Sequence, residues 1–324
     1  MDTGLPSRPR CGVTWHLFKP GELHSAVFAD PPFLVAPLLP RGGLAMIHGA
    51  KTAGKTQLAL TLGVAVATGT SFLHDYHCES GSVVFLEADM PKQMLQYRVA
   101  DAPETRVLHF VHTGPFDVVR LAGGALLPPD VQAVQALQPA LLIVDTLRKV
   151  HTLDENDSRT PLLVHTAWQR LFPGTALLFI HHDRKKSRDP AIPLVPEEAA
   201  RGTEAWSADI DVSMYLHKHR RTKDGAHTAT LGFSKVRYSD DIAPFPVQMR
   251  PGSLLIEPIR QTARQMLLAW LAANPTTTPQ EAVVWLQKSD LCGQSRAYKL
   301  VSELDSTGGW RFSTASGIAT PSPT

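Results

Sequence analysis

The chain has 324 residues, of which 43% are hydrophobic and 19% are charged, and its formal net charge is +2. This is an ordinary globular composition with enough apolar material for one large domain and a small one, or for two medium ones. So small a net charge does not indicate a nucleic-acid-binding protein, and any basic surface must be local.

The cysteines and the apolar stretches set the expected compartment. Cys11, Cys78 and Cys292 are odd in number and far apart, which supports neither a disulfide framework nor a cysteine zinc site. The segment HDYHC, with His74 and His77, lacks a second ligand pair and is not assigned to a metal. The N-terminus has no signal-peptide pattern, and the longest apolar stretch, LALTLGVAVATG, is too short to span a bilayer. We therefore expect a cytoplasmic protein with no membrane partner.

Residues 1–37 are a proline-rich lead-in, with one short helix expected from Glu22 to Phe28. After Gly43, apolar runs alternate with helical patterns. Six runs predict strands: GLAMIHG, SVVFLEAD, ALLIVDT, TALLFIHH, DIDVSMYLH and TATLGFSKV. The first four are apolar along nearly their whole length, as strands buried on both faces are. Helices are expected between them at 55–68, 92–101 and 162–171, so residues 38–258 are predicted to form an α/β domain with a mostly parallel sheet.

The pattern changes again after Pro258. Three helical segments, TARQMLLAWLAA, TPQEAVVWLQK and QSRAYKLVSELDS, precede a predicted strand in GGWRFST. This order predicts a small winged-helix-like domain at residues 259–312, followed by a disordered tail at 313–324. Residues 260–312 carry six Lys or Arg against four Asp or Glu, too small an excess for a duplex-binding module. Docking of a protein partner is therefore preferred over DNA binding for this domain.

A complete phosphate-binding pattern lies between the first strand and the first helix. The segment GAKTAGKT matches G-x-x-x-x-G-K-[ST] in the required strand–loop–helix context. Its glycines let successive backbone N–H groups turn toward phosphate, and the helix adds its positive N-terminal end. The residues expected to bind ATP are Gly49, Ala50, Lys51, Thr52, Ala53, Gly54, Lys55, Thr56 and Gln57. Of these, Lys55 is expected on the β- and γ-phosphates and Thr56 on Mg²⁺.

The ends of three other strands carry candidate site residues. Asp145 follows four apolar residues and is expected to hold Mg²⁺ through water. Glu87 and Asp89 are two residues apart, which predicts that they share one face and that one of them orients the attacking water. His181 or His182 could sense the γ-phosphate, because parallel sheets bind ligands at this edge.

The ordered set of these motifs is similar to the RecA-like ATPases. It resembles more closely the RepA-type branch, the plasmid hexameric replicative helicases and related ATPases of mobile elements. The resemblance covers about Leu38 to Gln248. It is carried by LLPRGGLAMIHGAKTAGKTQLALTLGVAVATG, DTLRKVHTLDENDS, FIHHDRKK, RGTEAWSADIDVSMYL and LGFSKVRYSDDIAPFP.

The resemblance implies roles for individual residues. Lys55 and Thr56 bind phosphate and Mg²⁺, and Asp145 supports the metal. Asp89 stands where the family has its catalytic glutamate, just as DMPKQMLQYR resembles the replicative helicases' E-M segment. Aspartate is one methylene shorter, so hydrolysis could be slow or Glu87 could take the role. His182 matches the sensor position.

Two further sets of residues follow from the resemblance. Lys235 and Arg237, in SKVRY, match the K-x-R pair that such hexamers insert into the neighbouring subunit's nucleotide site. The loops at 151–160 and 183–202 correspond to those that face the central channel. The first is acidic, whereas the second contains the basic residues Arg184, Lys185, Lys186 and Arg188 and is the expected site for single-stranded DNA. A second basic stretch, HKHRRTK at 217–223, is interpreted as solvated surface.

Three functions remain open from the sequence. The leading one is an oligomeric, hexameric RecA-like ATPase that binds single-stranded DNA and could act as a replicative-type helicase. The second is an ATP-switched assembly or regulatory ATPase without helicase activity, which the shortened Asp89 and the small net charge favour. A recombinase is a third and weaker interpretation.

Overall fold

The computed structural model describes residues 17–25, 32–99, 105–183, 205–221, 227–249, 255–259, 263–289, 294–306, 310 and 312. The strands are β1 (Phe33–Val35), β2 (Leu39–Pro40), β3 (Leu44–Gly49), β4 (Val83–Glu87), β5 (Leu108–His112), β6 (Leu141–Asp145), β7 (Ala176–Ile180), β8 (Val212–Arg221), β9 (His227–Val236), β10 (Phe245–Met249) and β11 (Ile256–Pro258). The helices are α1 (Pro20–Ser25), α2 (Lys55–Thr68), α3 (Lys92–Arg98), α4 (Val118–Gly123), α5 (Pro129–Ala136), α6 (Thr160–Leu171), α7 (Ala205–Ala208), α8 (Ala263–Ala273), α9 (Pro279–Lys288) and α10 (Gln294–Ser306), with a 3₁₀ turn η1 (Leu147–Lys149).

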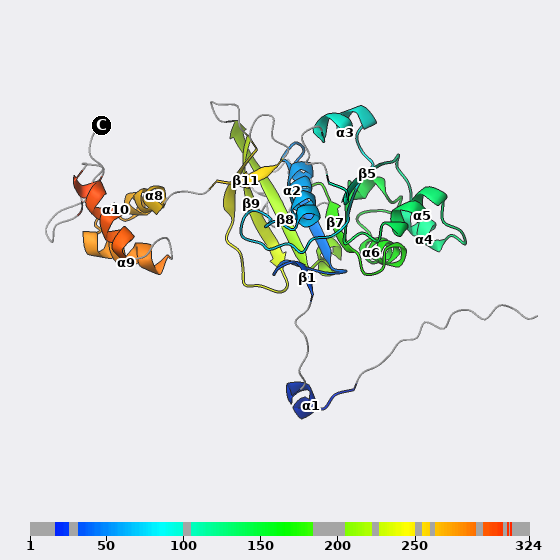
Figure 1. Cartoon of the computed structure of the whole chain (residues 1–324), viewed down its shortest axis with the longest axis horizontal. Coiled ribbons are helices and arrows are strands. Elements are labelled where there is room, and N and C mark those ends of the chain that lie inside the picture. Colours follow the sequence, from blue (N-terminus) through cyan, green and yellow to red (C-terminus); the bar gives the residue numbers. More distant parts are fainter. Residues whose placement is uncertain are drawn as a thin grey trace, which may run out of the picture.

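Nine strands form one central sheet, in the order β11-β10-β9-β8-β3-β7-β6-β4-β5 (Figure 1). The neighbouring strands β8, β3, β7, β6, β4 and β5 pair in parallel. The strands β8, β9, β10 and β11 pair antiparallel, each with the next one in this order. This confirms the predicted α/β fold with a mostly parallel sheet. The strand β7 lies between β3 and β6, so it separates the strand before the phosphate loop from the strand that ends in Asp145.

Both faces of the sheet are covered, which explains the unbroken apolar runs. Alternate residues of β3 pack into two hydrophobic clusters: Ile47 joins Leu58 of α2 on one face, and Met46 joins Trp168 of α6 on the other. The helix α2 has the bounds that the sequence predicted. No helix in the described part of the chain is both long and apolar enough to cross a bilayer.

Of the elements between β4 and β6, the helix α3 begins at Lys92, as the sequence predicted, whereas β5, α4 and α5 were not predicted. The edge strand β5 is only half buried, so its sequence LHFVH alternates with histidine and does not form an apolar run. The helix α4 has six residues, too few for a periodic pattern, and begins at a cap where Asp117 Oδ1 accepts from the N–H of Val119 and Arg120. The helix α6 begins at Thr160 rather than Leu162, because Pro161 is tolerated in a first turn.

The last strand of the sheet lies against the helix that follows the phosphate loop. The backbone N–H of Ile256 in β11 donates to Thr61 Oγ1 of α2 at 2.9 Å. A Cβ placed on Gly54, the residue before α2, would lie 3.0 Å from the Met249 side chain of β10. The antiparallel extension therefore packs directly on the start of α2.

Helices α8, α9 and α10 share a hydrophobic cluster of their own, which includes Leu271, Leu286 and Leu304. A capping box at Thr278 and Glu281 begins α9. In the predicted final strand, Trp310 and Phe312 are the residues that the structure describes, and neither is in a strand. The three helices are present, and the winged-helix assignment stays a prediction.

Three buried histidines surround the side chain of Trp206. The rings of His151, His165 and His181 all contact Trp206, with centroids 5.5 to 5.7 Å apart. Burial lowers the pKa of His165 to about 4, although Asp209 at 3.7 Å opposes the shift, and burial also lowers the pKa of His151.

We expect the free energy of unfolding to fall as the pH drops from about 6.5, the usual histidine pKa, toward 4. In that window the unfolded chain binds more protons than the folded one, and a shift of this size corresponds to on the order of 3 kcal/mol. Urea unfolding at pH 7, 6 and 5 measures the loss, and His165→Gln should lessen it. An equal pH dependence in both proteins would contradict the assignment to His165.

Candidate nucleotide site

The phosphate loop joins β3 to α2 in a shape that needs its glycines. Gly54 has φ 102°, in the region that favours glycine, and a Cβ on Gly49 would lie 2.8 Å from the carbonyl oxygen of Leu216 in β8. Gly54 carries no side chain that could cap α2, so the first N–H groups of the helix are available for an anion. The loop therefore has the backbone geometry that a phosphate-binding loop needs.

Lys55 is buried inside this loop. Its ammonium donates to the carbonyl oxygens of Gly49 and Ala50, both at 2.9 Å. Burial lowers the pKa of Lys55, while the carboxylates of Asp183 and Asp145 partly oppose the shift. The loop thus holds a cation at its centre at some cost in desolvation.

Thr56 and Asp145 come together as the sequence predicted. The Thr56 hydroxyl donates to Asp145 Oδ2 at 2.7 Å, and the Asp145 side chain is buried at the end of β6. A hydroxyl and a carboxylate beside a phosphate loop are the hard oxygen donors that Mg²⁺ prefers. These two residues fit that ion.

Glu87 and Asp89 lie in different surroundings. Glu87 ends β4 beside Asp145 of β6, is fully buried, and accepts from the N–H groups of Asp89 and Met90 at 2.7 and 2.9 Å. Asp89 lies past the strand with a carboxylate 46% exposed and 3.5 Å from Lys149 Nζ. The prediction that strand alternation places both on one face is wrong, because β4 ends at Glu87. Glu87 therefore stabilises the turn after β4, whereas the Asp89 carboxylate is exposed to solvent.

The end of β7 is tied to the phosphate loop by a pair that the sequence analysis missed. His181 is buried against Trp206, and His182 is half buried. Beyond them, Asp183 Oδ1 lies 2.9 Å from Nδ1 of His48, which is buried one residue before Gly49. No pattern marked this pair, because His48 lies within an apolar strand and Asp183 within a segment assigned to DNA.

Lys235 and Arg237 lie at the end of the sheet where the parallel strands begin, opposite the end that carries the phosphate loop. In register, Lys235 pairs with Ser213, which pairs with Met46 near the start of β3. The Lys235 ammonium donates to the carbonyl oxygens of Ser207 and Ala208, both at 2.8 Å. Arg237 Nη1 lies 3.0 Å from Asp211 Oδ1. The structure thus separates this pair from the chain's own phosphate loop.

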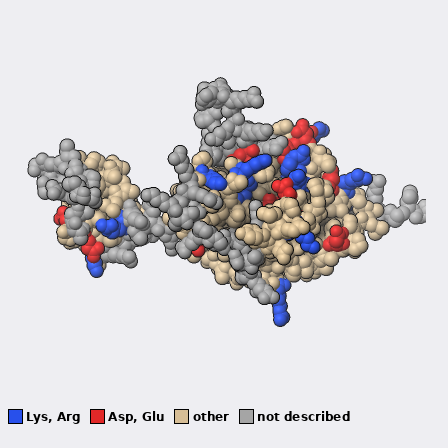
Figure 2. All heavy atoms as spheres, turned by 90° about the horizontal axis from the view of Figure 1, so that it is seen from above, with Lys and Arg blue, Asp and Glu red and all other residues tan. Residues whose placement is uncertain are grey.

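The basic residues predicted to contact DNA, Arg184, Lys185, Lys186 and Arg188, lie outside the described residues. Figure 2 looks onto the edge from which α3 rises and shows Lys and Arg side chains close to Asp and Glu side chains. The described part of this edge therefore mixes both signs.

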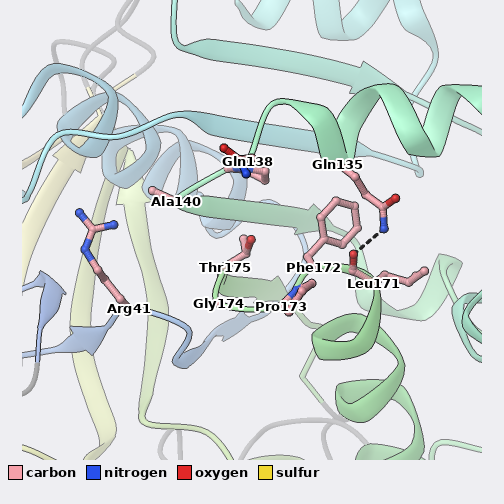
Figure 3. A pocket seen from close by; sticks show the side chains of 10 residues that line it. Arg41, Gln135, Gln138, Ala140, Leu171, Phe172, Pro173, Gly174 and Thr175 are labelled. Carbon is pink, nitrogen blue, oxygen red and sulfur yellow. Dashed lines mark hydrogen bonds between the residues drawn. The ribbon is translucent and has the colours of Figure 1, made fainter. Parts of the chain in front are cut away.

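A cavity of about 440 Å³ lies where β6 and β7 begin, at the edge away from the phosphate loop (Figure 3). Arg41, Gln138 and Thr175 line it, and Gln135 donates to the carbonyl oxygen of Leu171 at 2.6 Å. None of the residues predicted for the nucleotide lines this cavity, so it is separate from that site.

A phosphate loop before α2, a buried aspartate at the end of β6 and a strand inserted between them define a RecA-like P-loop ATPase fold. The chain belongs to AAA_25, an AAA domain family whose model matches residues 21–188, slightly more than half of the chain. Among solved structures, it is similar to the KaiC-like protein PH0186 from the hyperthermophilic archaeon Pyrococcus horikoshii OT3. That likeness has a TM-score of 0.48 and 13% identity, and covers 70% of this chain and 94% of the other.

Proposed function

We propose that the chain is an oligomeric, hexameric ATPase of the RepA-type branch, which hydrolyses ATP with Mg²⁺ and binds single-stranded DNA. Lys55 binds the β- and γ-phosphates, and Thr56 and Asp145 hold the metal, which neutralises charge on the phosphates. Asp89 orients the attacking water. His182 senses the γ-phosphate.

The position of Lys235 and Arg237 is the observation that supports the proposal of an oligomer. The backbone N–H of Arg237 donates to Asp211, whose own N–H donates to Leu44 at the start of β3. Gly49 is five positions after Leu44, which is about 17 Å along a strand. Arg237 is thus far from the phosphate loop of its own chain, and it could contact the nucleotide that is bound to a neighbouring subunit.

We expect mixed subunits to show this arrangement directly. Arg237→Ala removes the group given to the neighbour, and Lys55→Ala removes the phosphate site itself. Each variant alone should have little activity, whereas their mixture should recover part of it at interfaces that combine the two intact halves. The measurement is steady-state ATP hydrolysis against mixing ratio, with mixtures of Lys55→Ala and Lys288→Ala as the control. Hydrolysis by a strict monomer, at a specific rate independent of concentration, would contradict the proposal.

The alternative function is an ATP-switched assembly or regulatory ATPase that does not unwind DNA. It is favoured by the mixed charges of Figure 2 and by aspartate at position 89. Size-exclusion chromatography with ATPγS, and ATP hydrolysis with and without single-stranded DNA, separate the two functions. Neutralising Arg184, Lys185, Lys186 and Arg188 should weaken DNA binding and flatten its salt dependence. Nucleotide-dependent assembly without DNA binding would favour the alternative, with the C-terminal helices as a surface for a protein partner.

A further inference from the structure

The strand β8 brings a second lysine to the phosphate loop. Leu216 of β8 pairs in register with Gly49, so the strand continues beside the loop after β3 has ended. Met214 and Leu216 pack in the cluster on the α2 face, and strand alternation puts Lys218 on that same face. The Lys218 ammonium donates to Thr52 Oγ1 at 3.1 Å. The interpretation of residues 217–223 as solvated surface therefore missed this contact.

Thr52 is a specific point of contact on the loop. Its φ of 62° lies in the left-handed region, which β-branched residues rarely adopt. It stands between Lys51 and the glycine–lysine pair that opens α2, where the backbone curls around the phosphate position. A hydrogen bond from Lys218 thus reaches the part of the chain that surrounds the ligand.

The two lysines differ in what they can offer. Lys55 is buried and its ammonium is bonded to two carbonyl oxygens, so it is fixed inside the loop. Lys218 is exposed, and Thr52 can accept one of its three N–H donors, which leaves others for a further acceptor. A four-carbon stem also lets the ammonium move by a few ångströms without moving β8.

We propose that Lys218 is a phosphate-binding residue of the chain's own site, which contacts the polyphosphate of a bound nucleoside triphosphate beside Thr52. This inference rests on the proposed function, because it needs nucleotide in the loop. It assigns discrimination between nucleotides to Lys218: a cation at the loop favours ligands by the charge of their phosphates. Affinity should therefore depend on Lys218 most for triphosphates and least for monophosphates.

The test measures binding of ATPγS, ADP and AMP, each with Mg²⁺, to the full-length protein by calorimetry. Lys218→Ala should weaken the affinity for ATPγS about tenfold, the affinity for ADP less and the affinity for AMP hardly at all. The loss of affinity should be smaller at high salt. Lys218→Arg should keep most of the affinity. The matched controls are His217→Ala, the adjacent exposed residue on the other face of β8, and Lys288→Ala, which removes a remote positive charge. Both should bind like the wild type.

The outcomes separate this inference from the proposed function. Equal affinities for wild type and Lys218→Ala would overturn the inference and leave the proposed function intact. Equal losses for all three nucleotides would also overturn it, because Lys218 would then only support the shape of the loop. A wild-type protein that binds none of the three would overturn both.

Discussion

Lys55→Ala is expected to abolish nucleotide binding and turnover. The Lys55 ammonium is buried in the centre of the phosphate loop, and no other cation among the described residues is enclosed there. Loss of one such preorganised electrostatic contact typically costs a factor of about 100 to 1,000. Calorimetry with ATPγS and steady-state hydrolysis would measure the loss, with Lys288→Ala as a control for removing a lysine.

The same variant should remain folded. Burial lowers the pKa of Lys55, which means that the folded protein holds this charge at a cost. Removing this charge relieves that cost but takes a hydrogen-bond donor from the carbonyl oxygens of Gly49 and Ala50, so the two effects oppose each other and the melting temperature should change little. Normal turnover by a folded Lys55→Ala protein would refute the phosphate-loop assignment.

Asp89→Asn is expected to spare ATP binding and to slow hydrolysis by a factor of about 100 to 1,000, as loss of a positioned base does. Asp89 is the more exposed of the two candidate carboxylates, and its Oδ1 lies 3.5 Å from Lys149 Nζ. Single-turnover hydrolysis, started by mixing ATP with excess enzyme, separates this chemical step from binding.

Glu87→Gln is the matched comparison. Its amide oxygen can still accept from the N–H groups of Asp89 and Met90, but an NH₂ group enters a fully buried site. We expect a lower melting temperature and a smaller change in the hydrolysis step. If Glu87→Gln alone strongly slowed hydrolysis, Glu87 and not Asp89 would be the catalytic carboxylate. Unchanged hydrolysis in both variants would place the catalytic carboxylate elsewhere.

The sequence predicted those parts of the fold whose signal is local. The bounds of α2 followed from a glycine before the helix and another after it, and the four central strands from apolar runs buried on both faces. The half-buried edge strand β5 and the short helices α4 and α5 lack such signals, because few of their residues reach the core. Their positions depend on tertiary packing.

The candidate site divides in the same way. The pairing of Thr56 with Asp145 was predictable, because both belong to strand-end motifs at one edge of a parallel sheet. The pairs His48–Asp183 and Thr52–Lys218 join residues more than a hundred positions apart. Neither pair could be found without the register of β3 against β7 and β8. The different settings of Glu87 and Asp89 depended on where β4 ends.

The contact of β11 with α2 gives the phosphate loop a mechanical connection. Ile256 of β11 is hydrogen-bonded to Thr61, β10 packs over Gly54, and α8 is the next element along the chain after β11. A pull on the C-terminal helices must therefore pass along the backbone into the strand that lies against α2. A partner that grips α8, α9 or α10 under load would strain the start of α2. Tension on that partner would then change the affinity of the loop for phosphate. The affinity for nucleotide would therefore depend on the applied force.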